Sequence, residues 1–129
     1  MIDIEDRLAI LDLCSRYNYY ADTAASERWA DTFTPDGVFD GPAGHAEGRN
    51  ALIDFCDGLA KQFPGGMHFT DNHLFDQDGD LVRHKCFLSF QVPTEGRTDL
   101  MLLGYEDEIV RDKGEWKFRL RSVGPLRAD

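Results

Sequence analysis

The stretch Trp29-Ala30-Asp31-Thr32-Phe33-Thr34-Pro35-Asp36-Gly37-Val38-Phe39 marks the point where this chain changes from helix to strand. Just before it, Ser26 can cap a short helix over residues 26–33 whose apolar face carries Trp29, Ala30 and Phe33. The run Thr34-Pro35-Asp36-Gly37 is a turn signal that ends this helix, and Val38 and Phe39 begin an extended segment. The fold is therefore expected to combine helices with a sheet.

Helical periodicity is present on both sides of that stretch. Upstream, apolar residues recur at three- and four-residue intervals from Asp3 to Ala21, with acidic residues in the first turn, where the helix dipole favours negative charge. Downstream, residues 50–62 show the same spacing until Pro64-Gly65-Gly66 ends the helix. The sequence thus predicts three helices before Met67.

The remainder of the chain has the pattern of strands. Four extended runs, separated by turn signals rich in Gly, Pro and Asp, cover residues 67–75, 81–92, 100–110 and 116–123. A sheet with an apolar face must cover that face, and the three preceding helices are available to do so. We expect an α+β fold in which three N-terminal helices wrap a cone-shaped, curved antiparallel sheet and enclose a pocket.

Size and charge restrict the classes of function. The 129 residues suffice for one domain, taken as residues 1–129, with one core. There are 14 Lys and Arg residues against 24 Asp and Glu residues, a net charge of -10 that disfavours nucleic acid and anionic membranes as partners. The N-terminus lacks a signal-peptide pattern and no apolar run is long enough to span a membrane, so a cytoplasmic location is expected.

The sequence shows no motif for a metal or cofactor. Cys14, Cys56 and Cys86 are odd in number and widely spaced, which fits neither a disulfide framework nor a zinc site, so they are expected to be buried. No His and Asp or Glu cluster has metal-ligand spacing, and no glycine-rich phosphate loop or G-x-S-x-G elbow is present. Any chemistry is expected to need neither cofactor nor metal.

Several short motifs occur in an order that resembles one known family. Besides the stretch quoted above they are Arg16-Tyr17, Asp22, Gly48, His68 with Asn72, Asp78-Gly79-Asp80, Gly104-Tyr105-Glu106-Asp107 and Trp116-Lys117-Phe118 with Arg121. Together they resemble SnoaL-like domains of the nuclear transport factor 2 superfamily over nearly the whole chain. The resemblance implies a cystatin-like α+β barrel, often dimeric. It also implies relatives such as polyketide cyclases, scytalone dehydratase, ketosteroid isomerase and limonene epoxide hydrolase, together with members that only bind a ligand or protein.

His68 and Asp22 are the first candidates for catalysis. His68 resembles a histidine that scytalone dehydratase-like members place on a strand facing the cavity, where an imidazole can transfer a proton near neutral pH. Asp22 resembles the aspartate that pairs with this histidine and fixes its tautomer. The alternatives are a hydrogen-bonded structural histidine and an aspartate that caps a turn or faces solvent.

Tyr17, Tyr20 and Asp40 are further candidates. Tyr17 and Tyr20 share a helix face, and Tyr17 resembles the tyrosine with which ketosteroid isomerase stabilises an oxyanion; either could equally be a core aromatic. Asp40 falls near the general-base aspartate of ketosteroid isomerase-like sequences. Because a shift of one residue along a strand reverses the side chain, Asp40 points either into the cone or out to water.

The other histidines and the aromatic residues complete the expected pocket. Along an unbroken strand His73 would face away from His68, so the two could not share a metal or a proton. His84 lies on an apolar strand face and is either a second acid or base in the cavity or a core histidine. The scytalone dehydratase pattern has a second histidine near Ser89 or Phe90, which is absent here. Expected pocket residues are Tyr20, Trp29, Phe33, Phe55, Asn72 and His84.

These features lead to one functional expectation and two rivals. The expected function is an acid–base enzyme, a dehydratase or isomerase, that acts on a small hydrophobic cyclic or aromatic carbonyl compound, with His68, Asp22 and Tyr17 at the centre and without cofactor. One rival is a cavity that binds a small hydrophobic molecule without converting it. The other is an accessory module like the small subunit of ring-hydroxylating dioxygenases. A homodimer is expected from the resemblance alone.

Overall fold

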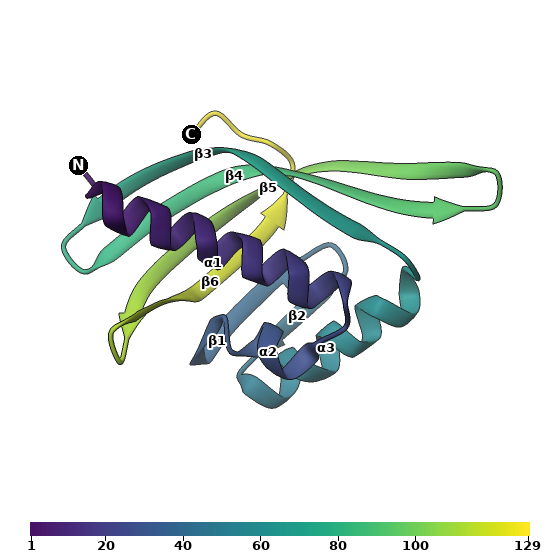
Figure 1. The fold of residues 1–129 in the computed structure, drawn as a ribbon, viewed down its shortest axis with the longest axis horizontal. Coiled ribbons are helices and arrows are strands. Elements are labelled where there is room, and N and C mark those ends of the chain that lie inside the picture. Colours follow the sequence, from purple (N-terminus) through teal and green to yellow (C-terminus); the bar gives the residue numbers. More distant parts are fainter.

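Three helices precede a long antiparallel meander in the computed structural model, which describes residues 1–129 (Figure 1). The helices are α1 (Ile4–Asp22), α2 (Ser26–Ala30) and α3 (Arg49–Gln62). The strands are β1 (Phe33–Gly41), β2 (Gly44–Glu47), β3 (Met67–Asp78), β4 (Leu81–Thr94), β5 (Arg97–Asp112) and β6 (Glu115–Gly124). The predicted α+β class is confirmed: all three helices precede Met67 and four strands follow it, while β1 and β2 lie among the helices. None of the helices has the combination of length and apolar character that a membrane span requires.

The six strands form one curved sheet in the order β2-β1-β6-β5-β4-β3. Neighbours are antiparallel except for β1 and β6, which run parallel, so the expectation of a wholly antiparallel sheet is wrong at this pair. The reason is that the segment joining β1 to β6 contains α3 and three other long strands, so no tight hairpin dictates their relative direction. The predicted turn at residues 34–37 lies inside β1 instead, where the register with β6 shifts between Phe33 and Val38.

The core lies between the concave side of the sheet and the helices. In Figure 1, α1 lies across the strands while α2 and α3 lie together near β1 and β2. Rings from several elements meet at Tyr17, whose centroid is 5.4 Å from that of Trp29 and 5.7 Å from that of Phe118. As expected, Cys14, Cys56 and Cys86 are free and buried.

A bulge in β3 determines which side chains of this strand face the core. Asp71 pairs with Phe87 but Leu74 pairs with Lys85, so β3 contains one extra residue at this point. Asn72 has φ 57°, a left-handed conformation that Asn tolerates better than most residues. The extra residue reverses the alternation, so that both His68 and His73 face the concave side. The expectation of opposite faces for these two histidines assumed an unbroken strand and is therefore wrong.

Candidate functional site

The end of α1 and the start of β3 hold a histidine and a carboxylate in direct contact. Asp22 is the last residue of α1, and its Oδ1 lies 2.5 Å from Nδ1 of His68. The other carboxylate oxygen accepts a hydrogen bond of 2.9 Å from the backbone N–H of His68. The two side chains are only 7% (His68) and 15% (Asp22) exposed. Because both carboxylate oxygens are bound to the same residue, the imidazole is held in one orientation.

His68 forms part of the wall of an apolar cavity of about 190 Å³. The cavity lies inside the cone, between α3, the turn joining β1 to β2, and the inner faces of β3 to β6. No charged side chain lines it, and the polar groups available are His68, Tyr17, Tyr105 and Gln62. The other lining residues are Phe39, Pro42, Ala43, Phe55, Leu59, Phe63, Leu88, Phe90, Met101, Leu103 and Val123.

Two phenols face the same cavity beside the histidine. The hydroxyl of Tyr105 donates to the hydroxyl of Tyr17 at 3.4 Å, which leaves the proton of Tyr17 free to donate elsewhere. The rings of Tyr17 and His68 are 6.1 Å apart and meet edge to face. Burial raises the pKa of Tyr17 to about 12, so this phenol stays protonated at neutral pH.

A buried charged network lies behind these phenols. The guanidinium carbon of Arg121 is 4.3 Å from the ring centre of Tyr17 and 3.5 Å from that of Tyr105. The Nε of Arg121 donates a hydrogen bond to Asp107 at 3.0 Å. Burial acts to lower the pKa of Arg121, but the Asp107 carboxylate outweighs this and raises the pKa above its ordinary value. The other oxygen of Asp107 is 2.7 Å from Nδ1 of His84, whose Nε2 lies 2.9 Å from Nδ1 of His73. Burial, His84 and Arg121 together lower the pKa of His73 to about 4.

The remaining predicted site residues do not all reach the cavity. Phe55 lines it, whereas Trp29 and Phe33 are buried in the neighbouring core. His84 is a core histidine bound to Asp107, so the alternative of a second acid or base in the cavity is wrong. Asn72 is exposed because the bulge turns it outward, and it is not a lining residue.

Asp40 points away from the cone. Its carboxylate is exposed and lies 3.3 Å from Nδ1 of His45 across the β1–β2 pair. The neighbouring Phe39 is the residue that faces the cavity, so the outward alternative for Asp40 is the one that the strand register selects.

Tyr105 was missed as a site residue by sequence reasoning. It lies on the same face of β5 as Met101 and Leu103, and this alternation was the signal that could have placed it in the cavity. Its partner Tyr17 comes from a helix 88 positions away in the sequence, so the contact between the two phenols has no local signature.

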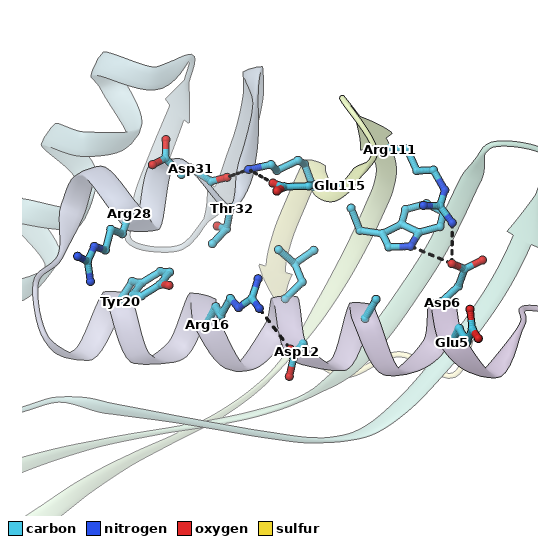
Figure 2. A pocket seen from close by; sticks show the side chains of 15 residues that line it. Glu5, Asp6, Asp12, Arg16, Tyr20, Arg28, Asp31, Thr32, Arg111 and Glu115 are labelled. Carbon is cyan, nitrogen blue, oxygen red and sulfur yellow. Dashed lines mark hydrogen bonds and ion pairs between the residues drawn. The ribbon is translucent and has the colours of Figure 1, made fainter.

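A second, more polar concavity lies between α1, the α2 region and the turn that joins β5 to β6 (Figure 2). It measures about 520 Å³ and is lined by side chains of both charges. Tyr20 is the one tyrosine in its wall. Its charged groups largely bind one another: Arg111 to Asp6 at 2.6 Å, and Arg16 to Asp12 at 3.4 Å. Tyr20 therefore lies here and not in the apolar cavity. Most charges of this surface are bound to one another, whereas the smaller cavity has the buried His68–Asp22 contact in its wall and is the better candidate site.

Comparison with known sequences supports the architecture. The sequence model of a family described as the SnoaL-like domain matches residues 3–122. No curated protein shows significant similarity to this chain.

Solved structures resemble the fold over almost its full length. Rv3472 from Mycobacterium tuberculosis, a protein of unknown function, is 28% identical with a TM-score of 0.87, covering 95% of this chain and 72% of Rv3472. A candidate aromatic ring hydroxylase from Novosphingobium aromaticivorans is 25% identical with a TM-score of 0.88, covering 98% and 93%. A candidate scytalone dehydratase from the same organism is 22% identical with a TM-score of 0.83, covering 98% and 97%, a likeness that shows the fold alone.

Proposed function

Because this chain belongs to the SnoaL-like domain family, which includes dehydratases, isomerases and cyclases, we propose that it is an acid–base enzyme that needs no cofactor. Its substrate would be a small, neutral cyclic carbonyl compound, and its reaction would be dehydration or isomerisation. The observation that carries the proposal is the His68–Asp22 contact at the wall of an apolar cavity. A plain core does not require a carboxylate that binds both the imidazole and the backbone N–H of one buried histidine.

His68 is assigned the role of base. Because Asp22 accepts from Nδ1–H, the lone pair is on Nε2, which makes no hydrogen bond within the protein and is the nitrogen available to substrate. Nε2 would remove a proton from the carbon next to the substrate carbonyl, and Asp22 would stabilise the imidazolium that forms. In a dehydration, the imidazolium then protonates the departing β-hydroxyl, so that water leaves; in an isomerisation, it returns the proton to the γ carbon.

Tyr17 is assigned to the carbonyl oxygen. That oxygen gains negative charge as the proton leaves, and a donor preorganised in a dry site stabilises it. Tyr17 accepts from Tyr105 and so can donate its own proton into the cavity, next to His68. The Arg121 cation behind both rings favours the same build-up of negative charge at the phenols.

The cavity itself indicates the substrate class. Its volume of about 190 Å³ is below the roughly 300–1,000 Å³ of pockets for drug-sized ligands. A cavity of about 150 Å³ can hold benzene, so one substituted ring fits here. No Lys or Arg lines the wall to neutralise a carboxylate or phosphate, which favours an uncharged substrate.

The test is a panel of single-ring ketones in deuterated water. Exchange of the α protons, followed by NMR, reports proton abstraction whatever the complete reaction is. Ring ketones with a β-hydroxyl or a β,γ double bond report dehydration and isomerisation through the conjugated enone that both form. We expect the protein to catalyse α-proton exchange in at least one ketone of this panel. Ligand binding without exchange or conversion for any panel member would favour the non-catalytic binder instead.

Tyr17→Phe is expected to lower kcat for the active substrate about 10²-fold, since removal of one oxyanion donor commonly costs at least this much. The apolar ring remains, so KM should change little. The control is Tyr20→Phe, which removes a phenol from the same helix but outside the cavity. Equal effects of the two substitutions would contradict the role of Tyr17.

A second copy of the chain is the partner that we propose. The outer face of β3 to β5 exposes Met67, Phe69, Phe87, Leu100 and Leu102, at 45–65% of their surface. Phe69 and Leu102 flank Ser89, and Met67 and Leu100 flank Gln91, so the centre of this face is uncharged. On a chain with net charge -10, this is where two copies can meet with least repulsion, and one patch can pair with itself around a two-fold axis.

Leu102→Glu is expected to convert the dimer to a monomer, because it introduces a negative charge opposite its symmetry mate. Light scattering coupled to size exclusion measures the mass directly. Leu8→Glu on α1, at a position with 60% exposure, is the matched control and should leave the mass unchanged. A wild-type chain that is monomeric at micromolar concentration would contradict the proposed dimer.

A further inference from the structure

Three metal-binding side chains converge under α1, outside the apolar cavity. They are the thiol of Cys14 from α1 and the imidazoles of His73 from β3 and His84 from β4. One ligand atom from each lies within 4.8 Å of the others. Cys14 and His84 are buried and His73 is partly exposed. The three metal-ligand atoms therefore lie below the surface, with His73 on the side nearest to solvent. None of the three lines the cavity that contains His68.

The hydrogen bonds around His84 prepare it as a metal ligand. Asp107 accepts from Arg121 at 3.0 Å and lies 2.7 Å from Nδ1 of His84, so the carboxylate is an acceptor and Nδ1 carries the proton. The lone pair of His84 is therefore on Nε2, which points to His73. A carboxylate on one ring nitrogen and a metal on the other is the common arrangement at metal-binding histidines.

The bulge in β3 aims the second imidazole at the same point. With unbroken alternation His73 would face the outer side of the sheet, opposite to His68. The left-handed Asn72 turns it inward, where its Nδ1 reaches 2.9 Å from Nε2 of His84. Bulges commonly redirect a side chain at functional sites, and this one converges on a thiol as well as an imidazole.

We propose that Cys14, His73 and His84 bind one Cu⁺ ion. A thiolate is a soft ligand that selects Cu⁺, and imidazole also suits copper. On binding, the Cys14 thiol releases its proton to solvent, and His73 directs the Nδ1 lone pair at the ion with its proton on Nε2. The charges of Cu⁺ and the thiolate cancel, beside an Arg121–Asp107 pair that is already compensated. Zn²⁺ in the same place would leave a net positive charge in the core, next to Arg121.

Such an ion would join α1 to β3 and β4. Cys14 precedes Tyr17 by three residues on the buried face of α1, so the ion would also fix the helix segment that carries Tyr17 into the cavity. Binding to the folded state alone stabilises that state, and a higher melting temperature with Cu⁺ is therefore expected.

The test is an anaerobic competition for Cu⁺ between the whole chain and the coloured chelator bicinchoninate. We expect wild type to withdraw one Cu⁺ per chain, and Cys14→Ser and His73→Gln each to abolish this. Cys56→Ser removes a buried thiol outside the cluster and should withdraw copper as wild type does. X-ray absorption of the loaded protein should show one sulfur and two nitrogen ligands.

Three results would overturn the proposal. The first is a wild-type chain that leaves all copper with the chelator. The second is equal loss of copper in Cys56→Ser and Cys14→Ser, which would mean non-specific thiol binding. The third is tight binding of Zn²⁺, tested alone in the same way, with no uptake of Cu⁺. Because His73 is partly exposed, His73→Gln keeps the test valid if Cys14→Ser does not fold; circular dichroism checks folding for each variant.

Discussion

His68→Gln is expected to lower kcat for the active ring ketone by about 10²- to 10⁴-fold, the usual contribution of a positioned general base. Glutamine is of similar size and polarity but cannot take up a proton, so substrate can still enter the cavity and KM should stay close to the wild-type value. The measurement is kcat and KM from α-proton exchange or enone formation. An unchanged kcat would remove His68 from the mechanism.

Asp22→Asn should cause a loss of similar size for a different reason. The asparagine oxygen would accept from the backbone N–H of His68, as one oxygen of Asp22 does now. Its NH₂ group would then face Nδ1 and force the ring proton onto Nε2, the nitrogen that must act as base. A normal rate in this variant would mean that the carboxylate does not orient the histidine.

The protein contains its own control for this experiment. His45 and Asp40 form a second histidine–carboxylate contact at 3.3 Å, with both side chains 60% exposed. His45→Gln and Asp40→Asn should leave kcat unchanged, because neither side chain lines the cavity. A loss in these variants as large as that in His68→Gln would show that the assay reports general damage to the fold.

Asp107→Asn is expected to destabilise the fold by about 3–5 kcal/mol, because it leaves the Arg121 cation buried without a compensating charge. The side chains of Asp107, Arg121 and His84 are all 0% exposed. Water cannot reach them to replace the lost ion pair. The measurement is the free energy of unfolding from urea denaturation, with the midpoint and slope compared between variants.

Glu108→Gln is the matched control for that substitution. Glu108 is the next residue on β5 and binds Arg119 at 2.8 Å, but on the outer face, with side chains 30% and 49% exposed. Its loss should cost no more than about 1 kcal/mol, as for other surface ion pairs. If Asp107→Asn also costs no more than about 1 kcal/mol, the phenol rings around Arg121, and not Asp107, compensate its charge.

Much of the architecture could be predicted because its signals are local. The three-and-four spacing in α1, the Pro64-Gly65-Gly66 stop after α3 and the turn signals between β3 and β6 each depend on neighbouring residues alone. The short β2 and the parallel direction of β1 were missed, since strand partners far apart in the sequence leave no local pattern.

The sequence by itself determined the three helices and the four strands after Met67, the family, and two of the candidate residues that the structure brings together, His68 and Asp22. Only the tertiary structure decided which side chains share a space. One extra residue at Asn72 turns His73 towards His84, and the register of β1 turns Asp40 outward while Phe39 faces the cavity. Side-chain direction in a sheet alternates at every residue, so a single bulge or shift reverses it, and bulge and register both depend on pairing with distant strands.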